Sequence, residues 1–397
     1  MQTILEPRTM QAWADATRAR GERIALVPTM GALHEGHVAL IAEARRRAKR
    51  VVVSIFVNPT QFDRYDDFER YPRTLEDDAA RCAAAGVDVI FAPSPRAMYP
   101  EGFQTAVEVA ALTVPLCGKT RPGHFRGVTT VVTKLFHAVR PHLAVFGEKD
   151  WQQLAVVRRM AADLDFGIEI VGVPTVREAD GLALSSRNRR LTPDDREAAR
   201  CLPRALDAGA EMVATGETRP AMIVGRAKME IAACPRARLE YAEVRDPETL
   251  EEVDEVTAPV LLGVAVWVGE VRLIDNRLLA PAEAERESAR SARAADGPPE
   301  SREAERESAH ASRRGPGASE ARSPRSGRAL DGPPESRDAE RESARSARAA
   351  DGPPESREAE RESAHASRRG PGASEARSPR SGRALDGPPG SSGGHDR

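Results

Sequence analysis

The chain has 397 residues, a formal net charge of −2 and four cysteines. A charge so close to zero argues against a protein held on nucleic acid, which needs an excess of Lys and Arg. The longest apolar run, residues 260–268, is far shorter than the roughly 20 residues of a membrane helix, and the first ten residues lack the pattern of a secretory signal. The cysteines are widely spaced without a C-x-x-C pair. We therefore predict a cytoplasmic protein with buried thiols, without nucleic-acid or membrane partners.

The sequence changes character at residue 282. Beyond this point the only apolar residues larger than alanine are Leu330 and Leu385, and 22 arginines balance 22 acidic residues. Such a segment cannot bury enough apolar surface to offset the entropy of ordering. Residues 284–290 recur at an offset of 55, and the repeat lacks the apolar face that stacked repeats need. We predict that residues 282–397 form a low-complexity disordered tail with a tandem duplication.

The first part of the chain alternates between apolar, β-branched runs and helix-like stretches. Strands that alternate with helices predict an α/β domain with a Rossmann-like, doubly wound parallel sheet that is covered on both faces. In such sheets the active site lies at the carboxyl ends of the strands. We assign this domain to residues 1–176. The predicted strands are residues 24–29, 51–57, 87–92, 143–146 and 168–173, with a helix over 151–164.

A smaller α+β domain is predicted for residues 177–281. Thr192 followed by Pro193 is typical of an N-cap with proline at the first helical position, and predicts a helix to about residue 214. We expect this domain, which a loop containing residues 184–187 joins to the first, to close over the active site. Its other predicted elements are a helix over 219–233 and strands near 239–244, 260–268 and 271–274.

The first polar motif is Pro-Thr-Met-Gly-Ala-Leu-His-Glu-Gly-His at residues 28–37, directly after the first predicted strand. His34 and His37 are three residues apart at a helix start, so both project from one face of its first turn. The unpaired N–H groups there attract an anion, and two imidazoles can donate hydrogen bonds to a phosphate whose charge rises during displacement. The alternatives are incidental surface histidines or a metal site, for which no third ligand is evident.

Three further motifs follow predicted strands or join the two predicted domains. They are Phe-Val-Asn-Pro-Thr-Gln-Phe at residues 56–62, Phe-Gly-Glu-Lys-Asp-Trp-Gln-Gln at 146–153 and Ser-Ser-Arg-Asn at 185–188. Residues 28–37 resemble the H-x-G-H element of the nucleotidyltransferase superfamily. Together the motifs resemble the pantothenate synthetases, over essentially all of residues 1–281. The resemblance implies an AMP-forming ligase that joins pantoate to β-alanine, with ATP and Mg²⁺, and a homodimer.

The resemblance assigns pantoate to four residues. The amides of Asn58 and Gln61 can bind hydroxyls and a carboxylate without adding charge, although Asn-Pro after a strand alone indicates only a turn. Arg121 lies in a glycine-containing basic loop before an amphipathic helix and can pair with a carboxylate; a surface charge cluster is the alternative. Gln153 completes the set.

Lys149 is assigned to the ATP phosphates. Its compact charge can offset the negative charge that develops on the triphosphate. The alternative is an exposed lysine that Glu148 and Asp150 neutralise. Together with Lys149, the resemblance names His34 and His37 as catalytic residues.

Residues 185–187 stand where related enzymes carry a K-M-S-K-S loop. Two hydroxyls and one guanidinium on a mobile loop can close over the β- and γ-phosphates, although Ser-Ser-Arg-Asn alone indicates a plain turn. No superfamily lysine is present in this loop, so Arg187 supplies the charge. The implied ATP site consists of Met30, His34, His37, Gly147, Lys149, Asp150, Ser185, Ser186 and Arg187.

The implied reaction has two steps. Pantoate attacks the α-phosphorus of ATP to give pantoyl-adenylate and pyrophosphate, and the amine of β-alanine then displaces AMP. Two other functions remain open. One is a different adenylyl transferase of the same fold, and the other is a binding protein whose Arg-rich tail contacts RNA or a partner.

Overall fold

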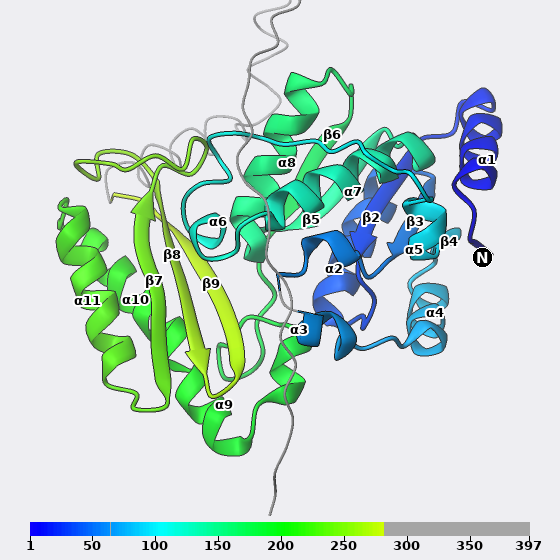
Figure 1. The fold of residues 1–397 in the computed structure, drawn as a ribbon. Helices are drawn as coiled ribbons and strands as arrows, with labels where there is room; N and C mark the ends of the chain where they lie inside the picture. Colours follow the sequence, from blue (N-terminus) through cyan, green and yellow to red (C-terminus); the bar gives the residue numbers. More distant parts are fainter. Residues whose placement is uncertain (64, 282–397) are drawn as a thin grey trace, which may run out of the picture. The chain divides into compact units, whose positions relative to one another are not determined.

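The computed structural model describes residues 1–63 and 65–281 (Figure 1). The disordered tail and the duplication predicted for residues 282–397 lie outside the described residues. Within them the chain forms a six-stranded sheet and a three-stranded sheet. Cys82, Cys117 and Cys201 are buried free thiols, as predicted, and Cys234 is half-buried.

The larger sheet is parallel throughout, with the strand order β1-β4-β3-β2-β5-β6. The order reverses at β2, which lies between β3 and β5, and ligands bind beside such a switch point in doubly wound sheets. This confirms the predicted Rossmann-like fold. The strands are β1 (Gln2–Ile4), β2 (Ile24–Thr29), β3 (Arg50–Ile55), β4 (Val89–Phe91), β5 (Leu143–Gly147) and β6 (Glu169–Val173).

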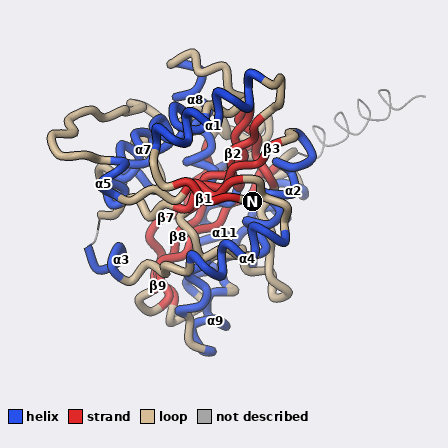
Figure 2. The backbone as a smooth tube through the Cα atoms, turned by 90° about the vertical axis from the view of Figure 1, so that its right-hand side faces the viewer, coloured by secondary structure: helices blue, strands red, loops and turns tan. Residues whose placement is uncertain are grey.

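Helices cover both faces of the parallel sheet (Figure 2). Ile24 and Leu26 join the apolar core beneath α1, α7 and α8, whereas Ala25 and Val27 join the core beneath α2 and α4. Because successive side chains of a strand point to opposite faces, a strand covered on both sides is apolar along its whole length. These helices are α1 (Pro7–Ala19), α2 (Glu35–Arg47), α4 (Leu75–Ala84), α7 (His124–Val139) and α8 (Trp151–Asp163).

The smaller sheet is antiparallel, in the order β7-β8-β9. Leu262 and Val264 of β8 pack in a separate core with the helices behind this sheet, whereas Leu261 packs into the core of the parallel sheet. The combination of helices with an antiparallel sheet confirms the predicted α+β class of this region. Its elements are α9 (Pro193–Ala199), α10 (Cys201–Ala214), α11 (Pro220–Ala232), β7 (Ala237–Arg245), β8 (Val260–Val268) and β9 (Val271–Leu279).

The single helix predicted from Thr192 to about residue 214 is wrong. Thr192 does cap a helix, since its hydroxyl accepts a hydrogen bond of 3.2 Å from the backbone N–H of Asp195. That helix ends at Ala199, and α10 starts after Arg200. Pro203 has no N–H to donate to the carbonyl of Ala199, which explains the break four residues before the proline.

Short helical segments complete the described chain. They are α3 (Tyr65–Glu69), α5 (Pro95–Met98), α6 (Cys117–Thr120) and the 3₁₀ turns η1 (Pro59–Gln61), η2 (Glu148–Asp150) and η3 (Ser186–Arg190). None of the helices in the described ranges is long and apolar enough to cross a membrane.

Candidate active site

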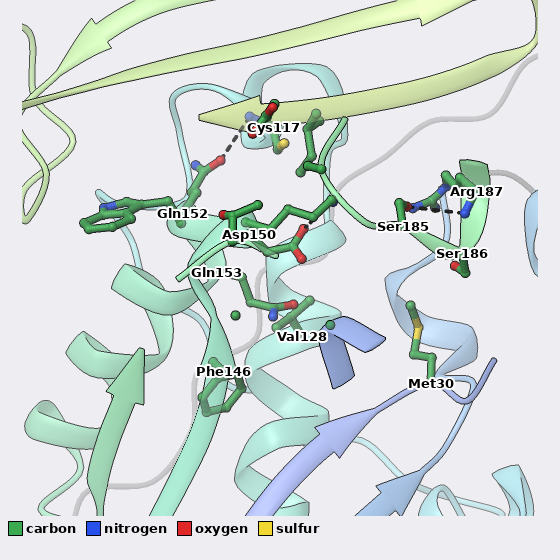
Figure 3. Close-up of a pocket in the computed structure, with 18 of the residues that line it drawn as sticks. Met30, Cys117, Val128, Phe146, Asp150, Gln152, Gln153, Ser185, Ser186 and Arg187 are labelled. Atoms are coloured by element: carbon green, nitrogen blue, oxygen red, sulfur yellow. Dashed lines mark hydrogen bonds and ion pairs between the residues drawn. The ribbon is translucent and has the colours of Figure 1, made fainter. Parts of the chain in front are cut away.

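A pocket of about 290 Å³ lies at the carboxyl ends of β2, β3 and β5 and is lined on another side by β7, β8 and β9 (Figure 3). The parallel sheet brings together motifs that are far apart in the sequence, because their strands end at the same edge. All residues predicted to contact ATP or pantoate line this pocket: Met30, His34, Asn58, Gln61, His37, Arg121, Gly147, Lys149, Asp150, Gln153, Ser185, Ser186 and Arg187.

The two histidines lie where α2 begins. His34 is the N-cap residue, and its ring centroid is 4.1 Å from that of His37. The backbone N–H of His34 donates to Nδ1 of His37 over 3.2 Å. Since Nδ1 of His37 accepts this bond, the neutral ring carries its proton on Nε2. Nδ1 of His34 is buried and has no hydrogen-bond partner among the described residues.

Both rings are neutral at pH 7. Burial and the nearby ammonium of Lys149 lower the pKa of His34 to about 4. Burial and the ring of His34 lower the pKa of His37 to about 3. A neutral imidazole still donates one hydrogen bond, so the pair offers N–H groups to an anion without two cations crowding Lys149.

Lys149 lies on the turn between β5 and α8. Its ammonium is 3.9 Å from a carboxylate oxygen of Asp150, a loose pair that leaves the charge available to a phosphate. Asn276 on β9 donates to the carbonyl oxygens of Glu148 and Lys149, over 3.0 and 2.8 Å. The smaller sheet therefore holds the backbone of the lysine turn. The sequence motifs did not include Asn276, because a single asparagine in a strand forms no pattern.

Asn58 and Gln61 form one hydrogen-bonded unit. Asn58 is 1% exposed. Its Nδ2 donates to Oε1 of Gln61 over 3.0 Å and to the carbonyl of Gly127 over 3.1 Å, and its Oδ1 accepts from the hydroxyl of Tyr99 over 2.8 Å. The Nε2 of Gln61 lies 3.1 Å from the sulfur of Met30, a weak acceptor. Gln61 thus presents its amide N–H groups to the pocket, while the amide of Asn58 is used inside the protein.

Two adjacent glutamines on α8 differ in their surroundings. Gln152 accepts from the backbone N–H of Cys117 over 3.0 Å and donates to the carbonyls of Leu112 and Pro115 over 2.9 and 2.7 Å. Gln153 makes no side-chain hydrogen bond among the described residues and lines the pocket. Figure 3 shows Gln152 turned toward Cys117, away from Gln153. Gln152 supports the pocket wall, and Gln153 is available to a ligand.

The two predicted arginines are paired with carboxylates at the pocket edge. Arg121 donates to Asp63 over 2.8 Å, and Arg187 donates to Asp67 over 3.0 Å. Residues 117–120 before Arg121 form the helical turn α6 rather than the predicted loop. A substrate anion that binds Arg121 or Arg187 must therefore displace the carboxylate of Asp63 or Asp67 from the guanidinium.

Further residues line the pocket without having been predicted. Nδ1 of His124 lies 2.7 Å from the carbonyl oxygen of Gln61, and burial lowers the pKa of His124 to about 4. This contact holds the His124 ring against the backbone of the turn that carries Gln61. Tyr241 and Arg272 reach the pocket from the smaller sheet, where no motif marks them. Within the described ranges no group of three or more His, Cys, Asp or Glu side chains is arranged to hold a metal ion.

The described part of the chain is similar to known proteins. The family model of pantoate–β-alanine ligases matches residues 2–278. The pantothenate synthetase of Moorella thermoacetica is 53% identical over 279 residues, which cover 70% of this chain and 98% of the relative. The structure of a pantothenate synthetase from Thermus thermophilus is 47% identical with a TM-score of 0.67, over 71% of this chain and 100% of that one.

A second solved structure carries ligands. It is the pantoate–β-alanine ligase of Francisella tularensis, complexed with β,γ-ATP and β-alanine, which is 34% identical with a TM-score of 0.59. The alignment covers 70% of this chain and 97% of that one. The match of the family model and the identity to nearly full-length relatives lead to one conclusion: the chain belongs to the pantoate–β-alanine ligase family.

Proposed function

We propose that the chain condenses pantoate with β-alanine at the expense of ATP, through pantoyl-adenylate, and releases AMP and pyrophosphate. A carboxylate and an amine form only a salt unless the carboxylate is first activated. The observation that carries the proposal is the convergence of His34, His37 and Lys149 with the amides of Gln61 and Gln153 in one pocket. A site with phosphate-binding groups next to uncharged amides suits the attack of a hydroxy acid on ATP.

In the first step the enzyme stabilises charge at the α-phosphate. His34 and His37 donate neutral N–H groups from the start of α2, where backbone N–H groups also favour an anion. Lys149 offsets the charge that develops on the pyrophosphate. The protein forms no covalent bond, because alignment of the reactants and charge stabilisation account for the rate.

Pantoate binds on the opposite side of the reacting phosphorus. Gln61 and Gln153 hydrogen-bond its hydroxyls and carboxylate, and Arg121 contributes charge once its pair with Asp63 opens. Asn58 acts through Gln61, since its own amide is occupied. The two uncharged amides orient the anionic substrate, and the charge of Arg121 attracts it to the pocket.

The nucleotide occupies the other side of the pocket. Met30, Gly147 and Asp150 contact the nucleoside, with Asp150 on the ribose side. Ser185, Ser186 and Arg187 close over the β- and γ-phosphates. Mg²⁺ enters with ATP as part of the substrate, held by phosphate oxygens and water, as is usual for this cation.

The proposal extends to the organisation of the protein. Residues 1–176 bind ATP and pantoate, and residues 177–281 close over the active site. The enzyme acts in the cytoplasm as a homodimer, and its partners are small molecules. The family membership supports the dimer, and the near-neutral charge supports the absence of a nucleic-acid partner.

The decisive experiment is isotope exchange. With pantoate, ATP and Mg²⁺ but without β-alanine, labelled pyrophosphate enters ATP, because the adenylate forms before the amine is needed. AMP accumulates with turnover only when β-alanine is added. Formation of ADP and phosphate would show an acyl-phosphate route and overturn the proposal. Pyrophosphate release without amine consumption would instead indicate another adenylyl transferase.

A further inference from the structure

A buried carboxylate lies behind the histidine motif, outside the pocket. Asp78 of α4 is 1% exposed. Its Oδ2 accepts from the backbone N–H of Ala32 over 2.9 Å, and its Oδ1 accepts from that of Leu33 over 2.7 Å. Its Oδ2 also accepts from the hydroxyl of Thr74 over 3.2 Å. No ion pair of Asp78 occurs within residues 1–63 and 65–281 of the structure, so the carboxylate is held by neutral donors.

The backbone that Asp78 holds is in an unfavourable conformation. Gly31 has a φ of +81° and Ala32 a φ of +51°. A non-glycine residue in the left-handed region is strained, so the turn needs support from its surroundings. A Cβ atom on Gly31 would lie 2.9 Å from Oδ2 of Asp78, which explains glycine at this position. The two hydrogen bonds to Asp78 hold the strained turn in place.

We propose that Asp78 is a positioning residue for adenylate formation. It fixes the turn 31–33 and thereby places the rings of His34 and His37 against the α-phosphate of ATP. Leu33 directly precedes His34, and the N–H of His34 donates to Nδ1 of His37. A rotation of the backbone at Leu33 therefore moves the ring of His34. It also breaks the hydrogen bond from the N–H of His34 to Nδ1 of His37, which keeps the proton of His37 on Nε2. This inference rests on the proposed roles of the two histidines.

The contrasting possibility is a purely structural role. The same bonds tie α4 to the loop after β2, so loss of the carboxylate lowers the stability of the fold in either case. A structural role affects exchange only through the fraction of folded protein. A positioning role lowers the rate of adenylate formation in protein that is fully folded, and it changes the ring tautomer of His37.

The test uses Asp78→Asn, which keeps the side-chain shape but turns an NH₂ group toward one of the two N–H donors. Loss of a hydrogen-bond partner that orients a metal ligand lowers activity by about 10- to 100-fold, and we expect an effect of this order for a group that orients the two histidines. We expect the maximal rate of pyrophosphate–ATP exchange to fall by this factor in the folded variant, with the KM for pantoate unchanged. Glu76→Gln is the matched control, because Glu76 is exposed on the same helix. It keeps the wild-type exchange rate.

A second variant separates positioning from stability. Ala32→Gly in the Asp78→Asn background relieves the strain of the turn, because glycine adopts a positive φ without strain. We expect the melting temperature to recover while exchange stays low, since the turn is no longer fixed. Recovery of exchange together with stability would overturn the proposal, as would a wild-type exchange rate in folded Asp78→Asn.

A spectroscopic measurement keeps this inference distinct from the proposed function. The ¹⁵N shifts of the imidazoles report which nitrogen of His37 carries the proton, whether or not the protein turns over. We expect the Nε2–H tautomer in the wild-type protein and a mixture in Asp78→Asn. An unchanged tautomer in the variant contradicts the inference. Absence of exchange in the wild-type protein would instead contradict the proposed function.

Discussion

Gly127 allows α7 to pack directly on the turn that carries Gln61. A Cβ atom added at Gly127 would lie 2.3 Å from the carbonyl oxygen of Thr60 and 2.8 Å from Cα of Gln61. Backbone atoms in a packed interior cannot be compressed to such distances. In Gly127→Ala the turn must therefore move by about 1 Å to regain an ordinary van der Waals separation.

The size of the effect follows from this displacement. A shift of about 1 Å in a group that positions substrate lowers the rate on the order of 10²-fold. Overpacking destabilises by about 1–3 kcal/mol, and alanine in a helix returns only roughly 0.5–1 kcal/mol relative to glycine. We expect Gly127→Ala to fold with a lower melting temperature and to lose roughly 100-fold in kcat/KM for pantoate.

The assay is the initial rate of pyrophosphate–ATP exchange at varied pantoate concentration, with thermal unfolding followed by circular dichroism. Gly225→Ala on α11 is the matched control, because a Cβ atom there has nothing within 4 Å. It keeps the wild-type kinetics. A wild-type kcat/KM in Gly127→Ala would refute the link between this helix contact and pantoate binding.

Three further outcomes are expected. His34→Ala, His37→Ala and Lys149→Ala each slow exchange by on the order of 10²–10³-fold with little change in stability; wild-type rates in all three would remove their assignment. Because the pKa of His37 is about 3 in the folded chain and 6.5 in its reference state, the unfolded chain takes up a proton first as the pH falls. The free energy of unfolding in urea therefore drops by about 2 kcal/mol from this group between pH 7 and 5, and His37→Gln shows a flatter profile. A chain that ends at Pro281 keeps its turnover and melting temperature, since no predicted site residue lies beyond it; a rise in the KM for ATP at low salt would contradict this.

The sequence predicts correctly those helices and strands whose pattern of apolar residues matches the burial of their side chains in the structure. β8 is apolar along its whole length, and β2 is apolar up to its last residue Thr29, because both faces of these strands are covered. β1 was not predicted, because its three residues are too few for a periodic pattern. The break at Arg200 was also missed, since Thr192 and Pro193 mark where a helix begins but not where it ends.

In the site, the sequence motifs predict residues that line the pocket but not the distant residues that support them. Gln153 was selected over Gln152 by the family resemblance alone, since adjacent glutamines give no physical basis for a choice. The structure shows which glutamine is available to a ligand, because the side-chain amide of Gln152 already forms hydrogen bonds with three backbone groups. The support that Asn276 gives to the lysine turn and that Asp78 gives to the histidine turn comes from residues far away in the chain. No spacing rule within a motif can predict such contacts.

The bond between Asn276 and the lysine turn has a consequence for the order of events during translation. Domains generally fold as units as they leave the ribosome, and all six parallel strands are made before β9. The nascent parallel sheet therefore has its strands in place while the carbonyls of Glu148 and Lys149 still lack their partner. A nascent chain can therefore form these two hydrogen bonds to the lysine turn only after Asn276 has emerged.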